Sequence, residues 1–266
     1  MGEKFFYQFR FGKDRDIKNL YDNKLWFSNP INFNDPYDCA IQFDFANFIQ
    51  KFADAFFRGT ELQNVPLEKM EEQASPQDLL AIKNDIERAK ENLEQMNEGL
   101  NDIVKNVFVS CFVKDYTVAP MWSYYANYHK GICVSYSEDN LNRLGCLKQV
   151  HYCNDFNKLY EELTNIYFRK WDLRDMFEYL IKYIITKAKG WSHEDEWRLI
   201  RFDCSVPNGK EGILVDTFKP SGIYIGCKAS NRLIGRINKY HKITGVPIYL
   251  MKMSNKTFKL IPIELK

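Results

Sequence analysis

The stretch Trp191-Ser-His-Glu-Asp-Glu-Trp-Arg-Leu-Ile200 predicts a strand around which the rest of the chain is arranged. Side chains alternate between the two faces of a strand, so Glu194, Glu196 and Arg198 are expected to share one face. Trp197 would then point the other way, into a hydrophobic core. The stretch therefore predicts a strand with a charged face and an apolar face.

The charged face has two interpretations. Two carboxylates and a guanidinium in one row are costly to bury unless they are paired or used in chemistry. A like charge raises the pKa of a carboxyl group and a neighbouring arginine lowers it, and such opposed effects are common in active sites. On this interpretation Glu194, Glu196 and Arg198 are candidate catalytic residues. The row could equally be a solvated strand face with one ion pair.

The composition is that of an ordinary globular protein. The 266 residues suffice for one large domain or two small ones, and 45% hydrophobic and 27% charged residues are typical values. A formal charge of +2 and a pI near 8.0 favour neither nucleic acid nor membrane as a partner. No run approaches the ~20 apolar residues of a membrane span, and the N-terminus has no signal-peptide pattern. We therefore expect a cytoplasmic protein without membrane contact.

The cysteines and histidines predict no metal centre. Seven cysteines without a CxxC pair make a poor disulfide framework, and they are expected to be reduced, as in the cytosol. The four histidines include no HExxH motif, and the chain has no P-loop, no GxGxxG after a strand and no nucleophile elbow. These absences exclude several common enzyme classes.

The N-terminal pattern predicts three elements before the first loop: a strand over 4–10, a helix over 14–22 and a strand over 24–28. The loop over 29–38 is dense in Asn, Asp and Pro, residues that set turns through their own backbone, so we expect it to be ordered. Asn34, Asp35 and Asp38 in this loop could equally face a ligand.

Residues 45–105 are expected to form a helical insertion within a single α+β domain that spans 1–266. The pattern predicts a helix over 45–57, a polar loop over 59–75 and a long helix that starts at Ser75-Pro-Gln-Asp78. This helix carries an apolar seam at three- and four-residue steps: Leu79, Ile82, Ile86, Ala89, Leu93, Met96, Leu100 and Ile103. The seam could pair with the preceding helix in a hairpin, or it could join a homodimer or another partner through helix 76–104.

Strands and helices then follow without regular βαβ alternation, which favours the α+β class. Strands are predicted over 106–113, 132–136, 147–152, 212–215, 223–227, 246–253 and 258–263. Helices are predicted over 119–128, 156–189 and 230–240. The second of these has Leu163, Ile166 and Tyr167 on its apolar stripe, is interrupted near Trp171 and ends at Gly190. His129, at the end of the first, could be a simple cap or a cation favoured at a helix C-terminus.

Several motifs occur in a fixed order: Phe6-Tyr7 with Arg10, Lys24-Leu-Trp-Phe-Ser28, Phe33-Asn-Asp-Pro-Tyr-Asp38, Val109-Ser-Cys-Phe112, Met121-Trp-Ser-Tyr-Tyr-Ala126 with His129-Lys-Gly131, and the Trp191–Arg198 stretch. Together they resemble the bacterial domain-of-unknown-function family 2971. The resemblance runs from the N-terminus to about residue 230 and omits 60–104, which fits an insertion. Members of that family are similar in context to prokaryotic defence and toxin proteins.

The order of an aromatic-Arg strand, a short helix, a Trp-Phe-Ser strand, a middle aromatic motif and a late Glu-x-Glu strand is similar to that of ADP-ribosyltransferases. This second resemblance implies a mixed or antiparallel split sheet with flanking helices. It also implies NAD as the substrate. Carried over by position, Arg10 would bind the diphosphate or ribose, and Ser28 or Ser110 would brace the site. The middle motif Trp-Ser-Tyr-Tyr departs from the usual Ser-Thr-Ser, so the Ser and Tyr roles stay open.

The same resemblance assigns roles near the reacting bond. Glu196 would hydrogen-bond the nicotinamide-side ribose, because a fixed carboxylate stabilises the oxocarbenium ion formed there. Glu194 could orient or deprotonate the acceptor. Residues implied to contact the nucleotide, several of them by stacking, are Phe33, Asn34, Trp122, Tyr125 and His129.

Three functions therefore stand as hypotheses. The first is an NAD-consuming enzyme of bacterial defence or toxin type, which transfers ADP-ribose to an unknown macromolecule or hydrolyses NAD. The second is a metal-dependent nuclease or hydrolase of a defence system, using Asp35, Asp38, Glu194 and Glu196 around a hard cation. The third is a non-catalytic binding module or antitoxin that recruits a partner through its helical insertion.

Overall fold

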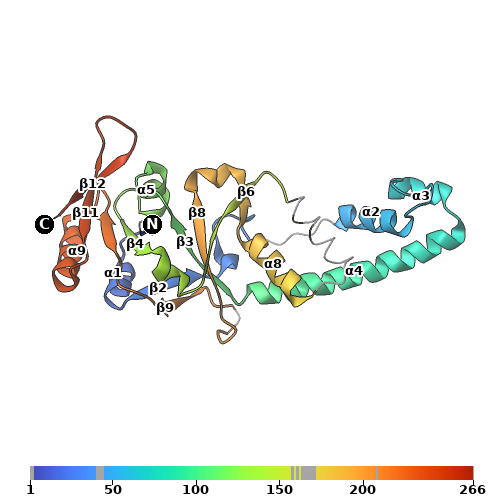
Figure 1. The fold of residues 1–266 in the computed structure, drawn as a ribbon, viewed down its shortest axis with the longest axis horizontal. Coiled ribbons are helices and arrows are strands. Elements are labelled where there is room, and N and C mark those ends of the chain that lie inside the picture. Colours follow the sequence, from blue (N-terminus) through green and yellow to red (C-terminus); the bar gives the residue numbers. More distant parts are fainter. Residues whose placement is uncertain are drawn as a thin grey trace.

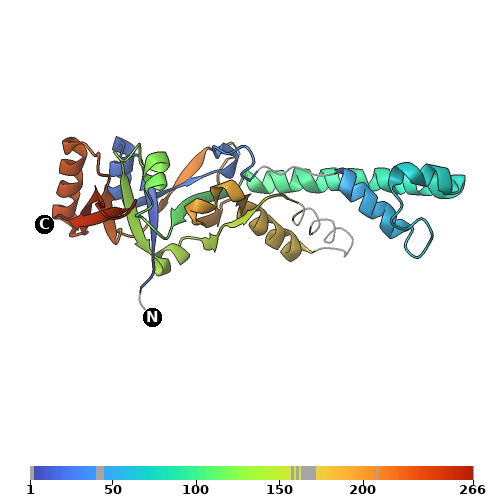
Figure 2. The same ribbon diagram turned by 90° about the horizontal axis from the view of Figure 1, so that it is seen from above.

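The computed structural model describes residues 3–39, 45–156, 159, 162, 172–207 and 209–265. The molecule is elongated, with the sheet toward one end and an arm of three helices at the other (Figures 1 and 2). The strands are β1 (Phe5–Arg10), β2 (Lys24–Ser28), β3 (Val107–Val113), β4 (Ile132–Ser137), β5 (Cys146–Gln149), β6 (His151–Cys153), β7 (Thr186–Ala188), β8 (Glu196–Phe202), β9 (Gly212–Asp216), β10 (Gly222–Ile225), β11 (Ile248–Met253) and β12 (Leu260–Glu264). The α-helices are α1 (Asp14–Tyr21), α2 (Phe45–Phe56), α3 (Leu67–Gln73), α4 (Pro76–Val104), α5 (Ala119–Tyr125), α6 (Glu138–Asn142), α8 (Leu173–Ile184) and α9 (Asn231–Thr244), with 3-10 turns η1 (Pro30–Asn32) and η2 (Lys189–Glu194).

The main sheet splits at β3. Its path among the described residues is β12-β11-β10-β4-β1-β3-β2-β9, and β8 lies on the other side of β3 with β5 beyond it. β8 pairs with β3 from Val107 to Val113. The opposite edge of β3 is shared, because Val113 pairs with Tyr7 of β1 while Val109 pairs with Ser28 of β2. Residues 110–112 of that edge therefore lie in a gap between β1 and β2.

The predicted α+β class is confirmed, and the sheet is mixed. β10 and β11 run parallel, whereas the other pairs in the main sheet are antiparallel. The short strands β6 and β7 form a separate parallel pair. An ADP-ribosyltransferase-like arrangement stays a prediction.

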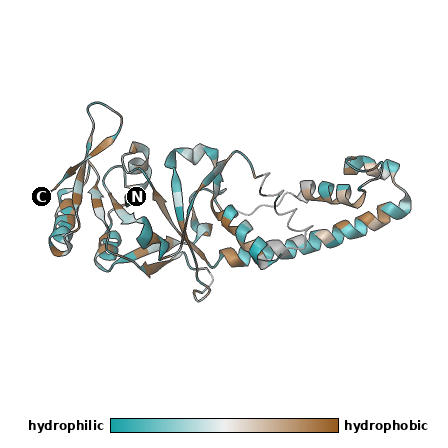
Figure 3. Ribbon diagram, viewed as in Figure 1, coloured by the Kyte–Doolittle hydropathy of each residue, from teal (hydrophilic) through white to brown (hydrophobic). Residues whose placement is uncertain are grey.

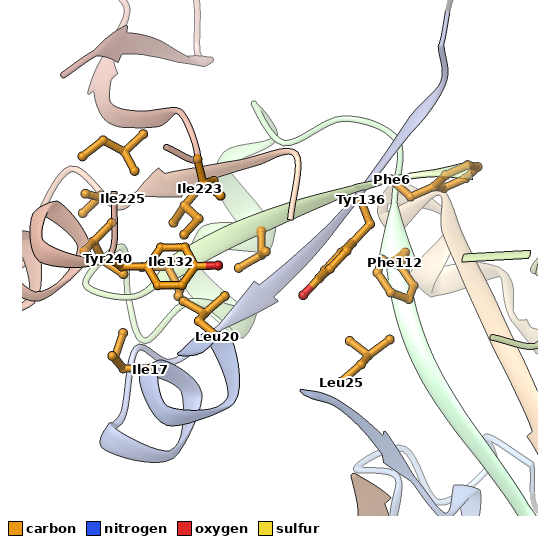
Figure 4. Close-up of a cluster of buried hydrophobic side chains, with 14 of the residues drawn as sticks. Phe6, Ile17, Leu20, Leu25, Phe112, Ile132, Tyr136, Ile223, Ile225 and Tyr240 are labelled. Atoms are coloured by element: carbon orange, nitrogen blue, oxygen red, sulfur yellow. The ribbon is translucent and has the colours of Figure 1, made fainter. Parts of the chain in front are cut away.

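One face of the sheet is covered by α1, α6 and α9. Ile17 and Leu20 of α1 and Tyr240 of α9 pack toward sheet residues such as Ile132 and Ile223 (Figure 4). Each of these side chains is 2% exposed or less. Full burial of one such side chain stabilises the fold by roughly 1.5–3 kcal/mol before chain entropy is counted. This cluster is the larger core of the molecule and contains none of the charged residues predicted to be functional.

Two smaller cores cover the other face. α5 packs Trp122 and Ala126 onto β4 and β11, near Cys133 and Met251. α8 and the end of α4 pack onto β3 and β8 in a second cluster that includes Ile200. The predicted orientation of β8 is confirmed, since Leu199 is fully buried in the larger core and Trp197 packs against that core. The charged side of β8 therefore faces the α5 and α8 layer.

The arm consists of α2, α3 and α4, and it leaves the sheet between β2 and β3. Ser75 caps α4 as predicted, its hydroxyl accepting a hydrogen bond from the Asp78 N–H at 3.2 Å. The predicted hairpin is confirmed, because Ile82 and Ile86 of α4 share a cluster with Ala53 of α2. The side chains of Leu93 and Met96 lie outside the described residues. Figure 3 shows hydrophobic and hydrophilic residues interspersed along α4.

The polar stretch 59–75 was expected to be a loop, but Leu67–Gln73 form α3, because Leu67 and Met70 pack into the arm's own cluster. In the described ranges no helix is both long and apolar enough to cross a membrane. The single-domain boundary at 1–266 with an insertion at 45–105 stays a prediction.

The long helix predicted over 156–189 is wrong at its C-terminal end. α8 stops at Ile184, and the next residues form β7 and η2 before β8 begins. Ile184-Ile185-Thr186 is a run of β-branched residues, which lose side-chain freedom in a helix and fit a strand better. The stripe residues Leu163, Ile166 and Tyr167 and the interruption at Trp171 lie outside the described residues.

Candidate functional site

A cavity of about 240 Å³ lies at the split between β1 and β2. Its walls come from the sheet, from the loop that follows β2, from α5 and from the β7–η2 segment. The lining residues are Tyr7, Gln8, Phe9, Trp26, Ser28, Phe33, Asn34, Asp38, Val109, Ser110, Cys111, Phe112, Val113, Met121, Tyr125, Lys187, Glu194 and Glu196. Three carboxylates and one ammonium thus meet aromatic and hydroxyl groups in one recess.

Arg198 holds two of the acidic side chains that line the cavity, Asp38 and Glu196. Its side chain is fully buried, and it donates hydrogen bonds to both oxygens of Asp38 at 2.8 and 2.6 Å. Its Nε donates to Glu196 Oε1 at 2.9 Å, and the guanidinium also donates to the Ile184 carbonyl. A bidentate pair of this kind fixes both partners in place. Arg198 therefore positions Asp38 and Glu196 but does not itself line the cavity.

Lys187 joins the two glutamates. Its ammonium donates to Glu194 Oε2 at 2.7 Å and to Glu196 Oε2 at 2.8 Å, and it lies 3.8 Å from Asp38 Oδ2. The Tyr125 hydroxyl donates to the other oxygen of Glu194 at 2.6 Å. The three carboxylates and two cations thus form one buried network, which we call the charged cluster: Asp38, Lys187, Glu194, Glu196 and Arg198.

Glu194 reaches this network by a route that strand alternation does not provide. It ends η2 and is not part of β8, which corrects the prediction that it shares the strand face. The next residue, Asp195, has φ = 44°, in the left-handed region. This conformation is costly for most residues but tolerated by Asp, and it turns the chain so that Glu194 and Glu196 converge on Lys187.

The loop of residues 29–38 is held by hydrogen bonds of its own side chains. The Asn29 amide donates to the carbonyls of Lys105 and Val107 at 2.9 and 3.2 Å, which ties the loop to the start of β3. Asp35 accepts from the Tyr37 N–H at 2.9 Å and from the Trp191 indole at 2.7 Å. Turn chemistry therefore accounts for Asp35, whereas Asp38 belongs to the charged cluster.

The cations set the ionisation of Glu196. Burial raises the pKa of this carboxyl, but Arg198 and Lys187 outweigh burial and lower the pKa to about 2. Burial opposes the charge on Lys187, yet Glu196 and Glu194 raise its pKa above the usual value. Burial, and then the hydrogen bond to Glu194, raises the pKa of Tyr125. Glu196 is thus an anion, Lys187 a cation and Tyr125 a neutral donor at neutral pH.

By formal charge the cluster has one negative charge in excess, since three carboxylates face two cations. The cluster borders the cavity, so this charge is available to a ligand there. In a partly dry site such a charge acts more strongly than it would in water. The arrangement can stabilise a positive charge that a bound molecule carries or develops.

Five of the predicted nucleotide-contacting residues line the cavity together with Glu194 and Glu196: Ser28, Phe33, Asn34, Ser110 and Tyr125. The other three, Arg10, Trp122 and His129, lie elsewhere. Arg10, Trp122 and Glu196 therefore do not line one recess.

Arg10 lines a second recess, of about 270 Å³, that shares Gln8, Phe9 and Trp26 with the cavity. Arg10 and Glu196 are not adjacent, but a chain of hydrogen bonds leads from Arg10 to the cavity. Arg10 Nε donates to Gln8 Oε1 at 2.8 Å, and Gln8 Nε2 donates to Ser110 Oγ at 2.7 Å. Arg10 therefore lines the recess beside the cavity and is linked to the cavity residue Ser110 through Gln8.

Trp122 is a core residue. Its side chain is fully buried, its ring meets Phe9 edge to face at 5.2 Å, and its indole donates to the Tyr116 carbonyl at 2.7 Å. One helical turn later, Tyr125 lies on the side of α5 that faces the cavity. Of the two aromatic residues predicted on α5, Tyr125 therefore lines the cavity, whereas Trp122 is part of the core.

His129 lies in a tight left-handed turn after α5. Asn127, Tyr128 and His129 all have positive φ, and the His129 N–H donates to the Trp122 carbonyl at 3.0 Å. Burial, and then Lys228, lowers the pKa of this imidazole below 6.5. His129 is therefore a neutral member of the turn at pH 7. It contacts the Ser123 hydroxyl at 2.9 Å and is neither a cation nor a cavity residue.

Sequence reasoning missed Lys187 and gave Asp38 only a secondary role. Lys187 falls within the helix predicted over 156–189, a range that gives it no special role. The β-branched run that ends at Thr186 was the one signal that could have placed it on a strand beside β8. Asp38 carried no signal beyond its presence in an ordered loop, because its partner Arg198 lies far away in the sequence.

The described residues contain no group of three His, Cys, Asp or Glu side chains arranged to hold a metal ion. In the charged cluster, Lys187 and Arg198 occupy the positions around the carboxylates that a cation would need. All seven cysteines are free thiols.

A family described as "Protein of unknown function (DUF2971)" matches residues 121–199. The resemblance to this family is thereby confirmed over the segment from α5 to β8. That segment contains Tyr125, Lys187, Glu194, Glu196 and Arg198. No curated protein and no solved structure matches the chain.

Proposed function

We propose that the cavity binds NAD and that the protein breaks the bond between nicotinamide and ribose, either transferring ADP-ribose to an acceptor or hydrolysing NAD. One observation carries this proposal: a buried cluster with one excess negative charge borders a cavity with aromatic walls. The nicotinamide ring of NAD is a planar cation. When the bond breaks, the positive charge moves to the ribose as an oxocarbenium ion.

The charged cluster suits that reaction because its groups are fixed before the substrate binds. Lys187 and Arg198 hold Glu196 as an anion, so no proton has to leave it during the reaction. Preorganised charges aimed at a developing opposite charge commonly make the largest contribution to catalysis. Glu194, held by Tyr125 and Lys187, is the carboxylate placed to orient an acceptor or a water molecule.

In this proposal the cavity holds the nicotinamide end of NAD, and the second recess holds its diphosphate. Phe33 and Trp26 line the cavity and can stack on a planar ring. Arg10 and Arg15 line the second recess, where guanidinium groups can pair with a diphosphate. A dinucleotide that lay along the split between β1 and β2 would put its cationic end at the carboxylates and its anionic middle at the arginines.

The test is nicotinamide release from NAD by the purified protein. Glu194→Gln keeps the shape of the side chain and removes one negative charge, so the release rate should fall about 100-fold or more. Asp216→Asn is the matched control, because Asp216 lies on β9 with its side chain 87% exposed. Circular dichroism verifies that both variants are folded. Absence of release by the wild-type protein, or equal rates in both variants, would refute the proposal.

A non-catalytic binding module is the second candidate, favoured by two exposed apolar residues of α4. Leu80 is 64% exposed and Ile103 is 43% exposed. If this module is the whole function, a partner should bind through α4 and biological activity should survive Glu194→Gln. The metal-dependent hydrolase is tested by calorimetry with Mg²⁺ or Mn²⁺, where heat of binding at about millimolar metal would favour it.

A further inference from the structure

The net charge of +2 conceals a strongly uneven distribution along the chain. Residues 217–263 contain no Asp or Glu. They contain nine basic residues: Lys219, Lys228, Arg232, Arg236, Lys239, Lys242, Lys252, Lys256 and Lys259. By contrast, residues 45–104 of the arm contain 12 acidic and 6 basic residues. The whole positive excess of the protein therefore lies in the C-terminal segment.

This segment forms β10, α9, β11 and most of β12, at the end of the molecule opposite the arm (Figure 1). Leu233, Ile237 and Tyr240 bury one side of α9 against the sheet. The basic residues lie on the same layer, together with exposed apolar residues such as Ile243 and Met253. The chain thus presents a polycationic surface at one end, separated from the cavity's carboxylates.

The basic residues of α9 are regularly spaced. Arg232, Arg236 and Lys239 follow an i, i+4, i+7 pattern, so they form one row along the helix. Arg232 and Arg236 also line a shallow recess of about 350 Å³ with Lys13 of the α1 N-cap. Arg236 pairs with Asp14 at the edge of this recess. Arg232 and Lys239 are exposed and form no ion pair with any residue that the structure describes.

The hairpin between β11 and β12 adds aromatic surface to the cations. Phe258 is fully exposed, and it stands between Lys256 and Lys259 in the sequence. Lys259 pairs with Asp115 at 3.3 Å, so Lys256 is the lysine beside Phe258 that forms no ion pair with any described residue. A fully exposed phenylalanine next to such a lysine is suited to stack on a base while the lysine contacts a neighbouring phosphate.

We propose that the surface formed by residues 217–263 binds single-stranded nucleic acid. The phosphate backbone carries one charge per 3.4 Å of strand, so a row of cations along a helix can contact several phosphates at once. Three features support this partner: the acid-free segment, the row Arg232–Arg236–Lys239, and the exposed Phe258. The proposal does not depend on NAD cleavage.

The acidic arm of a second copy is a weaker candidate partner. Its 12 acidic residues are interspersed with 6 basic ones, and pairs such as Arg88–Asp85 already offset part of the charge. A phosphate backbone has a higher and uninterrupted charge density. An anionic membrane is the other polyanion to be tested, because Ile243, Met253 and Phe258 of the same segment are exposed apolar residues. On α9 itself no exposed large apolar residue lies between the three cations of the row, which favours a nucleic-acid strand.

The test is fluorescence anisotropy with a labelled mixed-sequence DNA strand of about 20 nucleotides, longer than a single-strand site of roughly 4–16 nucleotides. We expect binding that weakens as salt is raised. The double variant Arg232→Glu/Lys239→Glu should bind about tenfold more weakly at low salt. Its salt dependence should be shallower by about 1.4 in the log–log slope, for two lost phosphate contacts.

The matched control is Lys69→Glu/Lys148→Glu, which makes the same change in net charge on exposed residues of α3 and β5. This control should retain most of the affinity. Phe258→Ala should weaken binding to the strand more than binding to a duplex of the same length.

Four results would overturn the proposal: no binding by the wild type at low salt, equal losses in both double variants, binding to anionic vesicles but not to DNA or RNA, or self-association through the arm without nucleic-acid binding. Nicotinamide release by the Arg232→Glu/Lys239→Glu variant reports separately on the NAD proposal.

Discussion

The charge of Glu196 depends directly on two cationic neighbours. It is 4% exposed, yet Arg198 and Lys187 keep it ionised by direct hydrogen bonds. A buried charge of this kind contributes to stability only while its partners are present. Removal of one partner from such a network typically costs about 3–5 kcal/mol, because an uncompensated charge remains buried. The residue is therefore both a candidate catalytic group and a determinant of acid stability.

The first prediction concerns stability in acid. Burial opposes the ionisation of Glu196, but Arg198 and Lys187 prevail and lower its pKa from 4.5 to about 2. The unfolded chain therefore binds more protons than the folded chain between these two values. The contribution of Glu196 is present above pH 4.5 and is lost as the pH falls toward about 2. It amounts to about 3 kcal/mol.

Urea unfolding at a series of pH values between about 6 and 2 measures this contribution. Glu196→Gln should be less stable than the wild type at the upper end, and the difference should shrink as the pH falls. Asp216→Asn, on the exposed surface, should follow the wild-type curve. A constant difference between Glu196→Gln and wild type across the series would contradict the lowered pKa.

Residue patterns predicted three members of the charged cluster but missed Lys187 and gave Asp38 only a secondary role. Glu194, Glu196 and Arg198 stood out because they are close together in the sequence. Lys187 and Asp38 reach them only through the fold: Lys187 through an unexpected strand, and Asp38 from 160 residues away in the chain. Trp122 and Tyr125 had the same aromatic signal, and only the packing of α5 assigns one to the core and the other to the cavity.

At the scale of elements, close backbone approach explains the turn between α5 and β4. A Cβ added at Gly131 would lie 2.2 Å from the Arg10 carbonyl oxygen of β1. The turn before it contains three consecutive left-handed residues, and the Gly131 N–H donates to the Ala126 carbonyl at 2.8 Å. A side chain at this position would have to push β1 and α5 apart. The glycine therefore allows the helix to pack directly beside the strand.

The second prediction compares Gly131 with Gly235. Gly131→Ala should lower the free energy of unfolding by about 2 kcal/mol or more, since backbone atoms have to move. Gly235 lies within α9, where an added Cβ meets nothing within 4 Å. Gly235→Ala should raise the free energy of unfolding by about 0.5–1 kcal/mol through helix propensity. Thermal unfolding followed by circular dichroism measures both, and effects of the same sign would contradict this account.

Periodicity predicted most elements because each has an apolar pattern that agrees with its final packing. α1, α4 and α9 begin within two residues of their predicted starts, and β2 matches its predicted range. The pattern failed over 184–196, where β7, η2 and a left-handed residue replace a helix end. Short elements of this kind bury few residues of their own, so tertiary contacts decide their conformation.

At the scale of the whole molecule, the arm has a core separate from that of the sheet. Ile82, Ile86 and Met70 pack with residues of α2, whereas Leu100 at the other end of α4 packs with α8 and β3. A single helix thus joins two hydrophobic clusters. Interactions within each cluster are local, so the outer part of the arm can open without disruption of the sheet.

The third prediction tests that separation. Ile86→Ala removes a buried side chain from the arm's cluster and should destabilise that cluster by about 2–5 kcal/mol. Native-state hydrogen exchange should then show faster exchange in α2, α3 and the first half of α4, while β1, β3 and β4 remain protected. Ile237→Ala, in the larger core beneath α9, is the counterpart and should accelerate exchange throughout the sheet. If Ile86→Ala accelerated exchange in the sheet and in the arm equally, the arm would instead share one cooperative core with the sheet, and α4 would transmit any event at its tip directly to β3 beside the cavity.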